Sequence, residues 1–170
     1  MEISTVYDFD VCTLDGNIVR LSDYRGQTLL IVNTASSCGF AEQMADLEGL
    51  YQRLRQHNFI ILAFPCGQFN QEPMDNNELK AYYSERKLVS FPIFQKVNVN
   101  GKDAHPLFNF LSFSCPGIFN TRYLKWNFTK FLISPNGKPV TRFSPITNVL
   151  IIEDFIQEYW YSTHNHNNFK

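Results

Sequence analysis

The sequence has no long apolar run and little net charge. No stretch approaches the roughly 20 apolar residues that span a bilayer, so we expect no stable membrane insertion. Met1 to Ser4 supply neither a basic nor an apolar segment, so we expect no secretory signal. A net charge of −1 gives no broad basic surface, and we expect no nucleic-acid partner.

Cysteine is also scarce, and its four occurrences are scattered over the chain: Cys12, Cys38, Cys66 and Cys115. None forms a C-x-x-C pair, and no spacing matches a metal site, so we expect neither a metal nor any other bound cofactor. Unpaired thiols are typical of a reducing compartment. The composition therefore favours a cytoplasmic protein with free cysteines.

What the sequence does contain is a strand–helix–strand pattern. Thr28–Val32 and Phe59–Phe64 are apolar runs typical of buried parallel strands. Between them, apolar residues recur at helical spacing from Phe40 to Leu54, which predicts an amphipathic helix. Such a unit has parallel strands and a right-handed crossover.

The rest of the chain predicts a single α/β domain over residues 1–170, with a polar, frayed tail at about 162–170. The element order is that of a thioredoxin-like fold with an N-terminal β-hairpin and a helical insertion. The further expected elements are a hairpin over Tyr7–Leu21, a helix over Asp75–Lys87, a strand and turn at Val97–Gly101, a short helix from Pro106, a hairpin of Leu124–Ser134 with Val140–Phe143, and a closing helix over Val149–Trp160.

Cys38 follows the first buried strand and precedes the amphipathic helix. Unpaired N–H groups and partial positive charge at a helix start favour thiolate over thiol. This placement predicts a reactive cysteine. The alternative is a small buried thiol that only fills the core.

Three chemistries lose support around Cys38. A dithiol oxidoreductase needs a second cysteine, but Ala35 and Ala41 occupy the matching positions. No further soft ligands suit a metal carrier. A cysteine hydrolase needs a histidine base, and sequence order brings none of the four to this sheet edge: His57, His105, His164 and His166. Attack of a lone thiolate on a peroxide remains, which gives a sulfenic acid and needs N–H donors around the leaving oxygen.

Three blocks of sequence support this chemistry by resemblance. Asn33–Gly39, Phe64–Pro73 and Trp126–Leu132 resemble the signature blocks of glutathione peroxidases, in the family order. Three shorter stretches also match: Asn100–Gly101, Ala104–Leu107 and Arg142–Pro145. The resemblance implies reduction of hydrogen peroxide and organic hydroperoxides in the response to oxidative stress.

The family's catalytic tetrad is a selenocysteine or cysteine, a glutamine, a tryptophan and an asparagine. The resemblance implies that Cys38 is the peroxidatic nucleophile and that Gln71, Trp126 and Asn127 are its hydrogen-bond donors. It implies glutathione or thioredoxin as the reducing co-substrate.

The sequence departs from the family pattern in the Gln71 loop and in the helix after it. The loop is one residue short, which leaves Gln68 as a competitor for the Gln71 role, although Gln71 directly precedes Glu72-Pro73. Thioredoxin-dependent members carry a resolving cysteine where this chain has Ser84. We therefore expect direct reduction by a small thiol such as glutathione, with Cys115 and then Cys66 as weaker candidates for a substitute resolver.

Two further departures concern the helix start and the assembly. Ala41 stands where the family usually has threonine, which would loosen the start of the helix. The segment Phe113–Tyr123 lacks the long insertion of tetrameric members, so we expect a monomer with an open site that favours bulky hydroperoxides.

Two alternatives stay open. The first is a redox sensor, in which Cys38 is oxidised and the oxidation passes to a partner without multiple turnover. The second is a peroxiredoxin, which has less support because the Thr-x-x-Cys spacing of that family requires threonine at Ala35. Lys125, Lys130 and Arg142 are dispersed, and we expect them to be solvated surface rather than an anion site.

Overall fold

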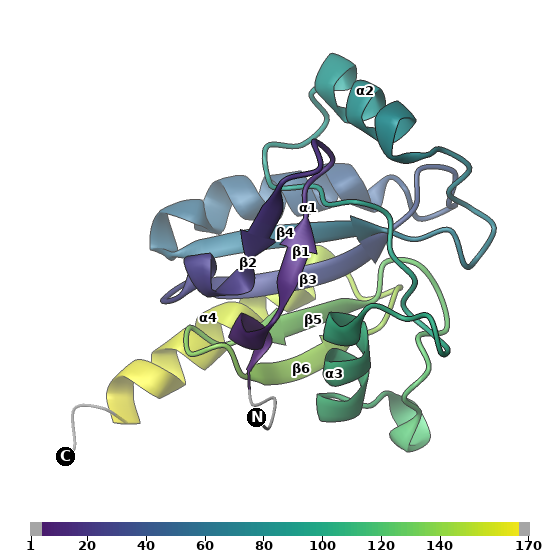
Figure 1. Cartoon of the computed structure of the whole chain (residues 1–170). Helices are drawn as coiled ribbons and strands as arrows, with labels where there is room; N and C mark the ends of the chain where they lie inside the picture. The colour runs from purple at the N-terminus through teal and green to yellow at the C-terminus, as the bar shows by residue number, and fades with distance from the viewer. Residues whose placement is uncertain (1–4, 167–170) are drawn as a thin grey trace.

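A four-stranded mixed sheet forms the centre of the computed structural model, which describes residues 5–166, with backbone only for 164–166. The strand order is β4-β3-β5-β6. β3 (Thr28–Thr34) pairs in parallel with β4 (Phe59–Pro65), whereas β5 (Lys130–Ile133) runs antiparallel to both β3 and β6 (Pro139–Phe143). The predicted βαβ unit and the later hairpin are therefore confirmed, and they meet along β3 and β5 (Figure 1).

Each face of this sheet carries its own core. On the face that we call the aromatic face, Leu29 and Ile31 pack with phenylalanines of neighbouring segments; the buried rings include Phe64, Phe94, Phe108 and Phe131. α3 (Pro106–Ser114) covers this face together with the N-terminal hairpin of β1 (Asp10–Cys12) and β2 (Ile18–Arg20). Alternation along β3 sends Leu30 and Val32 to the other side.

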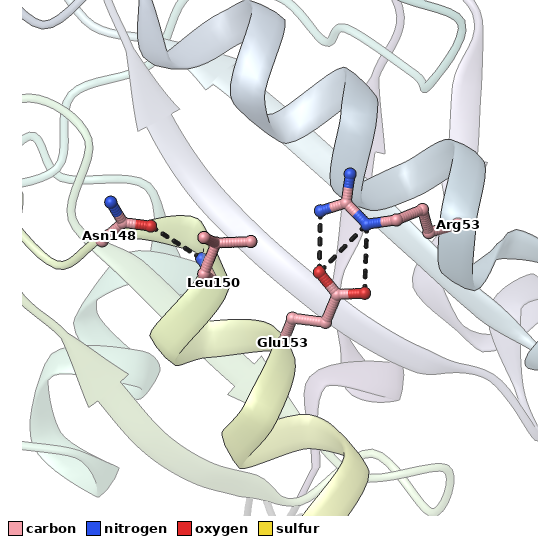
Figure 2. A network of polar contacts seen from close by, with 4 residues as sticks. All are labelled: Arg53, Asn148, Leu150 and Glu153. Carbon is pink, nitrogen blue, oxygen red and sulfur yellow. Dashed lines mark hydrogen bonds and ion pairs between the residues drawn. The ribbon is translucent and has the colours of Figure 1, made fainter.

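The second face, which we call the α1–α4 face, is covered by α1 (Gln43–Leu54) and α4 (Val149–His166). Aliphatic side chains such as Leu47, Leu50 and Ile152 fill it together with the rings of Phe59 and Phe128. At its outer edge the guanidinium of Arg53 on α1 binds the carboxylate of Glu153 on α4, with a shortest N–O distance of 2.7 Å (Figure 2).

Outside both cores lies α2 (Asn76–Arg86), which projects from the body of the molecule (Figure 1). Asp75 caps it with the predicted capping box: its side chain accepts from the Glu78 N–H, and the Glu78 carboxylate accepts from the Asp75 N–H. Leu79 is its one buried residue. α2 is thus an insertion that contacts the rest of the molecule through Leu79, the Lys80–Asp15 ion pair and Tyr83, which packs against the core of the opposite face from α3.

Short 3-10 segments connect the elements: η1 (Val6–Asp8), η2 (Leu21–Tyr24), η3 (Arg55–His57) and η4 (Ile118–Asn120). Within residues 5–166 no helix is both long and apolar enough to cross a bilayer, and no group of three or more His, Cys, Asp or Glu side chains is placed to hold a metal ion.

Two strand predictions were wrong in part. Strand β5 begins at Lys130 rather than Leu124, because the preceding residues form a turn. Val97–Gly101 is a loop without a strand, since the Gln68 side chain accepts from the Val99 and Asn100 N–H groups and replaces a neighbouring strand.

The two helix boundaries near the site and the C-terminus also differ from prediction. α1 begins at Gln43, not at Phe40. α4 continues to His166, so residues 162–166 are helical rather than frayed, and 167–170 lie outside the described residues.

Candidate active site

Cys38 lies in the turns that join β3 to α1, at the C-terminal edge of the parallel strands. It is 6% exposed and belongs to the α1–α4 face. The Phe40 N–H donates to Cys38 Sγ at 3.4 Å, and the Ala41 N–H donates to the Cys38 carbonyl at 2.9 Å. The N–H donor at the sulfur, that of Phe40, therefore comes from this turn, because α1 itself begins further along the chain.

Ser36 and Ser37, which precede Cys38, are hydrogen-bonded to Gln71 and Glu72. The Ser37 N–H donates to the Gln71 carbonyl at 3.0 Å. The Ser36 N–H and hydroxyl donate to the two carboxylate oxygens of Glu72, each at 2.8 Å. Since Glu72 is 4% exposed, these bonds are shielded from water and hold the two loops in register.

The Lys96 side chain also holds the loop that carries Gln71 and Glu72. Its ammonium donates to the carbonyls of Glu72 and Met74 at 2.8 and 2.9 Å. A Cβ built on Gly67 would approach the Lys96 side chain to 2.8 Å, so glycine leaves room for this lysine. The loop that carries Gln71 is thus braced on both sides.

Trp126 and Asn127 lie in the turn that precedes β5. Asn33, at 0% exposure on β3, organises this turn: its Nδ2 donates to the Trp126 carbonyl at 3.3 Å, and its Oδ1 accepts from the Thr129 N–H at 3.1 Å. Phe128 adopts a φ of 63°, which reverses the chain between these two bonds. The side chain of Asn33 thereby adds to the backbone bonds of the same residue, which accepts from the Phe128 N–H at 2.6 Å and donates to the Thr129 carbonyl at 3.3 Å, and the predicted strand begins only at Lys130.

The Asn127 amide points to Gln71. Its Nδ2 donates to Gln71 Oε1 at 3.2 Å, while its buried Oδ1 has no hydrogen-bond partner among the described residues. The Gln71 carbonyl also accepts from the Ser37 N–H. Two hydrogen bonds therefore connect the cysteine turn to Asn127 by way of Gln71. The Trp126 ring is 38% exposed and packs 5.6 Å from that of Phe69.

Gln68, the competitor for the Gln71 role, is occupied elsewhere. Its Oε1 accepts from the Val99 and Asn100 N–H groups, and its Nε2 donates to the Asn100 carbonyl at 2.9 Å. This amide therefore holds a loop on the aromatic side. Gln71, not Gln68, contacts Asn127.

The other cysteines have different surroundings from Cys38. Cys66 and Cys115 are buried on the aromatic face, and desolvation raises the pKa of both thiols, against a smaller opposing effect of Arg142 on Cys115. Ser84 is exposed on α2. Burial that outweighs the opposing effect of a nearby cation keeps a thiol protonated and weakly nucleophilic.

The two histidines whose side chains are described lie away from the cysteine turn. His105 caps α3 by accepting from the Leu107 N–H at 3.2 Å, and burial lowers its pKa. His57 lies beside Trp160, with ring centroids 6.1 Å apart. Neither is positioned as a base for Cys38.

Sequence reasoning missed Asn33, Glu72 and Lys130. Asn33 and Glu72 stand inside the quoted blocks, and their polar character next to buried strands was the available signal. Lys130 was expected at the surface but is 0% exposed. Lys130 begins an apolar strand, and a strand with both faces covered buries every side chain. This position could have indicated burial.

A groove of about 190 Å³ opens beside the Trp126–Thr129 turn. Lys125 and Arg142 contribute cationic side chains to its lining, and Ile118 contributes an apolar one. Arg142 donates to the Thr121 and Tyr123 carbonyls, so it also supports the groove wall. Lys125 is exposed, as expected, whereas Arg142 is half-buried, so the expectation of a solvated surface is wrong for Arg142, whose guanidinium is held by the two carbonyls.

The chain resembles known proteins along most of its length. The sequence profile of the family described as glutathione peroxidase matches residues 6–112. A protein named glutathione peroxidase homolog BsaA, from Halalkalibacterium halodurans, is 48% identical over 155 residues, covering 91% of this chain and 98% of that protein. The hydroperoxy fatty acid reductase gpx1 of Synechocystis sp. is 47% identical over 149 residues, covering 84% and 88% respectively.

Solved structures give the same result for the fold. The apo crystal structure of Trgpx superposes with a TM-score of 0.77 at 39% identity, covering 92% of this chain and 95% of that one. A thioredoxin-family thiol:disulfide interchange protein from Chlorobium tepidum shares the fold alone, with a TM-score of 0.65 at 13% identity over 93% and 97% of the two chains.

The fold is therefore thioredoxin-like, as predicted, and the protein is an oxidoreductase that reduces hydroperoxides. On the match to the family profile and to close relatives along most of its length, this chain belongs to the glutathione peroxidase family.

Proposed function

We propose that the chain is a cysteine-dependent peroxidase in which Cys38 attacks the hydroperoxide and Gln71, Trp126 and Asn127 act as donors. The observation that carries the proposal is the linkage Ser37–Gln71–Asn127, which joins the loops bearing three of these residues. The turn of Trp126 is continuous with that of Asn127.

The first step forms an S–O bond and breaks the O–O bond. The Cys38 thiolate donates the electron pair to one peroxide oxygen, which becomes the sulfenic acid oxygen, and the other oxygen leaves as water or an alcohol once protonated. Gln71 Oε1 already accepts from Asn127, so the Gln71 Nε2 group is left to donate. The indole N–H of Trp126 is a second neutral donor.

Neutral donors fit the surroundings of Cys38. The nearby carboxylate, Glu72, accepts from Ser36 and Met74 and is held as a brace rather than a base. Donors aimed at a developing oxyanion lower the barrier without a proton equilibrium of their own.

The proposed reductant is a small thiol. Ser84 cannot form a disulfide, and the buried thiols Cys66 and Cys115 have raised pKa values, which argues against either as a resolver. A first thiol would condense with the sulfenic acid to a mixed disulfide and water; a second would attack that disulfide and release the Cys38 thiolate. Lys125 and Arg142 would attract an anionic thiol such as glutathione to the groove.

The proposed peroxide class is bulky lipid or organic hydroperoxides. Apolar side chains stand exposed near the groove: Ile118 at 72%, Phe119 at 95% and Tyr123 at 61%. They could cover an acyl chain whose hydroperoxide reaches Cys38. One relative is itself named a hydroperoxy fatty acid reductase.

We also propose that the chain is a single domain and a monomer in the cytoplasm. The short Phe113–Tyr123 segment supports the monomer, and the unpaired cysteines support the compartment. Light scattering of the purified protein would test the oligomeric state.

Steady-state consumption of peroxide, with glutathione and separately with thioredoxin, tests the function. Cys38→Ser should reduce turnover to the rate of the reductant alone, whereas Cys115→Ser should leave glutathione-dependent turnover unchanged. Dependence of thioredoxin-coupled turnover on Cys115 would contradict direct reduction. Faster turnover of hydrogen peroxide than of a fatty acid hydroperoxide would contradict the substrate preference.

A further inference from the structure

Lys130 is a buried cation that the peroxide chemistry above does not use. It opens β5, opposite Val32 on β3 and Phe143 on β6, and its relative exposure is 0%. Its side chain reaches Gln43 on α1, so it enters the α1–α4 face that also holds Cys38. An ammonium in such a place loses most of its hydration.

The partners of this ammonium are neutral. Lys130 Nζ donates to Gln43 Oε1 at 2.5 Å and to the Pro145 carbonyl at 3.1 Å, and Gln43 Nε2 donates to the same carbonyl at 2.8 Å. Within residues 5–166 the two close ion pairs are Arg53–Glu153 and Lys80–Asp15, and Lys130 is in neither. The three groups thus form a closed triangle around one charge, which has no carboxylate within the triangle.

Gln43 links this triangle to the sulfur. Its backbone N–H donates to the Phe40 carbonyl at 2.9 Å, and the Phe40 N–H in turn donates to Cys38 Sγ at 3.4 Å. Lys130 therefore holds, through the Gln43 side chain, the residue that fixes the N–H donor of the nucleophile. Phe40 also packs against the same core as Cys38.

The cost of burial makes a purely structural role a poor explanation. Replacing a buried charge by an apolar side chain of similar volume is often neutral or stabilising. Burial lowers the Lys130 pKa to about 8, and Asp46, one turn beyond Gln43 on α1, acts in the opposite direction. Near pH 7 the site therefore retains a cation that packing alone does not require.

We infer that Lys130 is a positioning residue for Cys38: its ammonium fixes Gln43 and, through it, the Phe40 N–H on Sγ, and this N–H favours the thiolate. The inference deepens the proposed function, since it rests on Cys38 as the nucleophile. No contact between Lys130 and the peroxide is involved.

The main test compares Lys130→Met with the unsubstituted chain. Alkylation of Cys38 by iodoacetamide is followed at its own peptide by mass spectrometry across pH, because three other thiols are present. We expect alkylation near pH 7 to slow about tenfold, at the lower end for loss of a hydrogen bond to a charged group, and the pH at which its rate rises to increase. Sulfenic acid formation with peroxide should slow in parallel.

Leu132→Ala is the matched control, because Leu132 lies on the same strand and the same face. It should lower thermal stability and leave the pH dependence of Cys38 alkylation unchanged. Lys130→Met should not lower thermal stability but should change the pH dependence of Cys38 alkylation.

Gln43→Leu provides a second variant that keeps Lys130 but removes the side-chain bond between its ammonium and residue 43; the backbone bond from residue 43 to the Phe40 carbonyl stays. It should slow alkylation in the same direction by a smaller factor, and it decides the question if Lys130→Met does not fold. Alkylation and peroxide rates within twofold of the unsubstituted chain would overturn the inference. If the unsubstituted chain fails to form a sulfenic acid while alkylation still depends on Lys130, the proposed function fails and the positioning role stands.

Discussion

Alternate side chains of β3 enter different surroundings. Leu29 and Ile31 face stacked and edge-to-face rings, such as Phe64 and Phe94 with centroids 4.8 Å apart. Leu30 and Val32 face the α1–α4 side, where Cys38 and Lys130 interrupt an otherwise apolar core. One strand thus supports two cores of different composition.

The thiols show what this difference means. Cys66 and Cys115, on the aromatic face, have pKa values raised by desolvation. Cys38, on the other face, has the Phe40 N–H at its sulfur and a buried cation two hydrogen-bonded residues away. Cys66 also has neighbouring N–H groups, of Gln68 and Val99, and the Lys96 cation, and burial still raises its pKa, so the presence of donors beside a thiol does not by itself set its role.

The largest expected effect is a loss of stability from a substitution in the aromatic face. Phe108 is 0% exposed and packs edge-to-face on Phe64, at 5.5 Å between centroids. Phe108→Ala should lower the free energy of unfolding by about 3–5 kcal/mol, because it removes a buried ring and leaves a cavity. Urea denaturation measures it. Phe113→Ala, on the same helix but 63% exposed, should change stability by at most about 0.5 kcal/mol.

Gln71→Leu tests the α1–α4 face, where the proposed chemistry takes place. The rate of sulfenic acid formation at Cys38 should fall by about 10²–10³-fold, the usual cost of one oxyanion donor, and stopped-flow measurement with trapping of the product checks it. Gln68→Leu is the control: it should cost about 1–3 kcal/mol of stability by leaving the Val99 and Asn100 N–H groups unpaired. Equal loss of rate in both variants would contradict the assignment to Gln71.

A pH series sharpens the contrast between the two cores. The Lys130 pKa is lowered from 10.5 to about 8 in the folded chain, so the unfolded chain binds more protons between these values. The cost of burying the charge is therefore full below pH 8 and falls as pH rises towards 10.5. Relative to Lys130→Met, the unsubstituted chain should gain stability over this range. A gap independent of pH would mean that Lys130 is not buried as a cation.

The smallest effect concerns the edge of the α1–α4 face. Arg53 and Glu153 form an ion pair whose side chains are 46% and 13% exposed (Figure 2). Hydrogen bonding to Glu153 raises the Arg53 pKa, but water and salt screen the pair. Arg53→Met should cost less than about 1 kcal/mol, and thermal melts at low and high salt should show the difference shrinking as salt rises.

Predictability followed the range of the interactions. The parallel strands, the capping box of α2 and the proline-started α3 depend on neighbouring residues, and each was predicted from the sequence. The start of β5 was not, because the side chain of Asn33, 93 residues before Trp126, occupies the polar groups of that turn. The loop at Val97–Gly101 was missed for the same reason, with Gln68 as the distant partner.

Sequence by itself determined the kinds of side chain available for the chemistry: one cysteine at a strand-to-helix junction, with an indole and two amides in blocks resembling those of a peroxidase family. Only the tertiary structure decided how these were held, through Glu72 on Ser36, Asn33 on the turn before β5, and Lys130 on Gln43. The reason is that local pattern sets backbone conformation, whereas a buried polar group takes its partner from whatever segment the fold brings within hydrogen-bond distance.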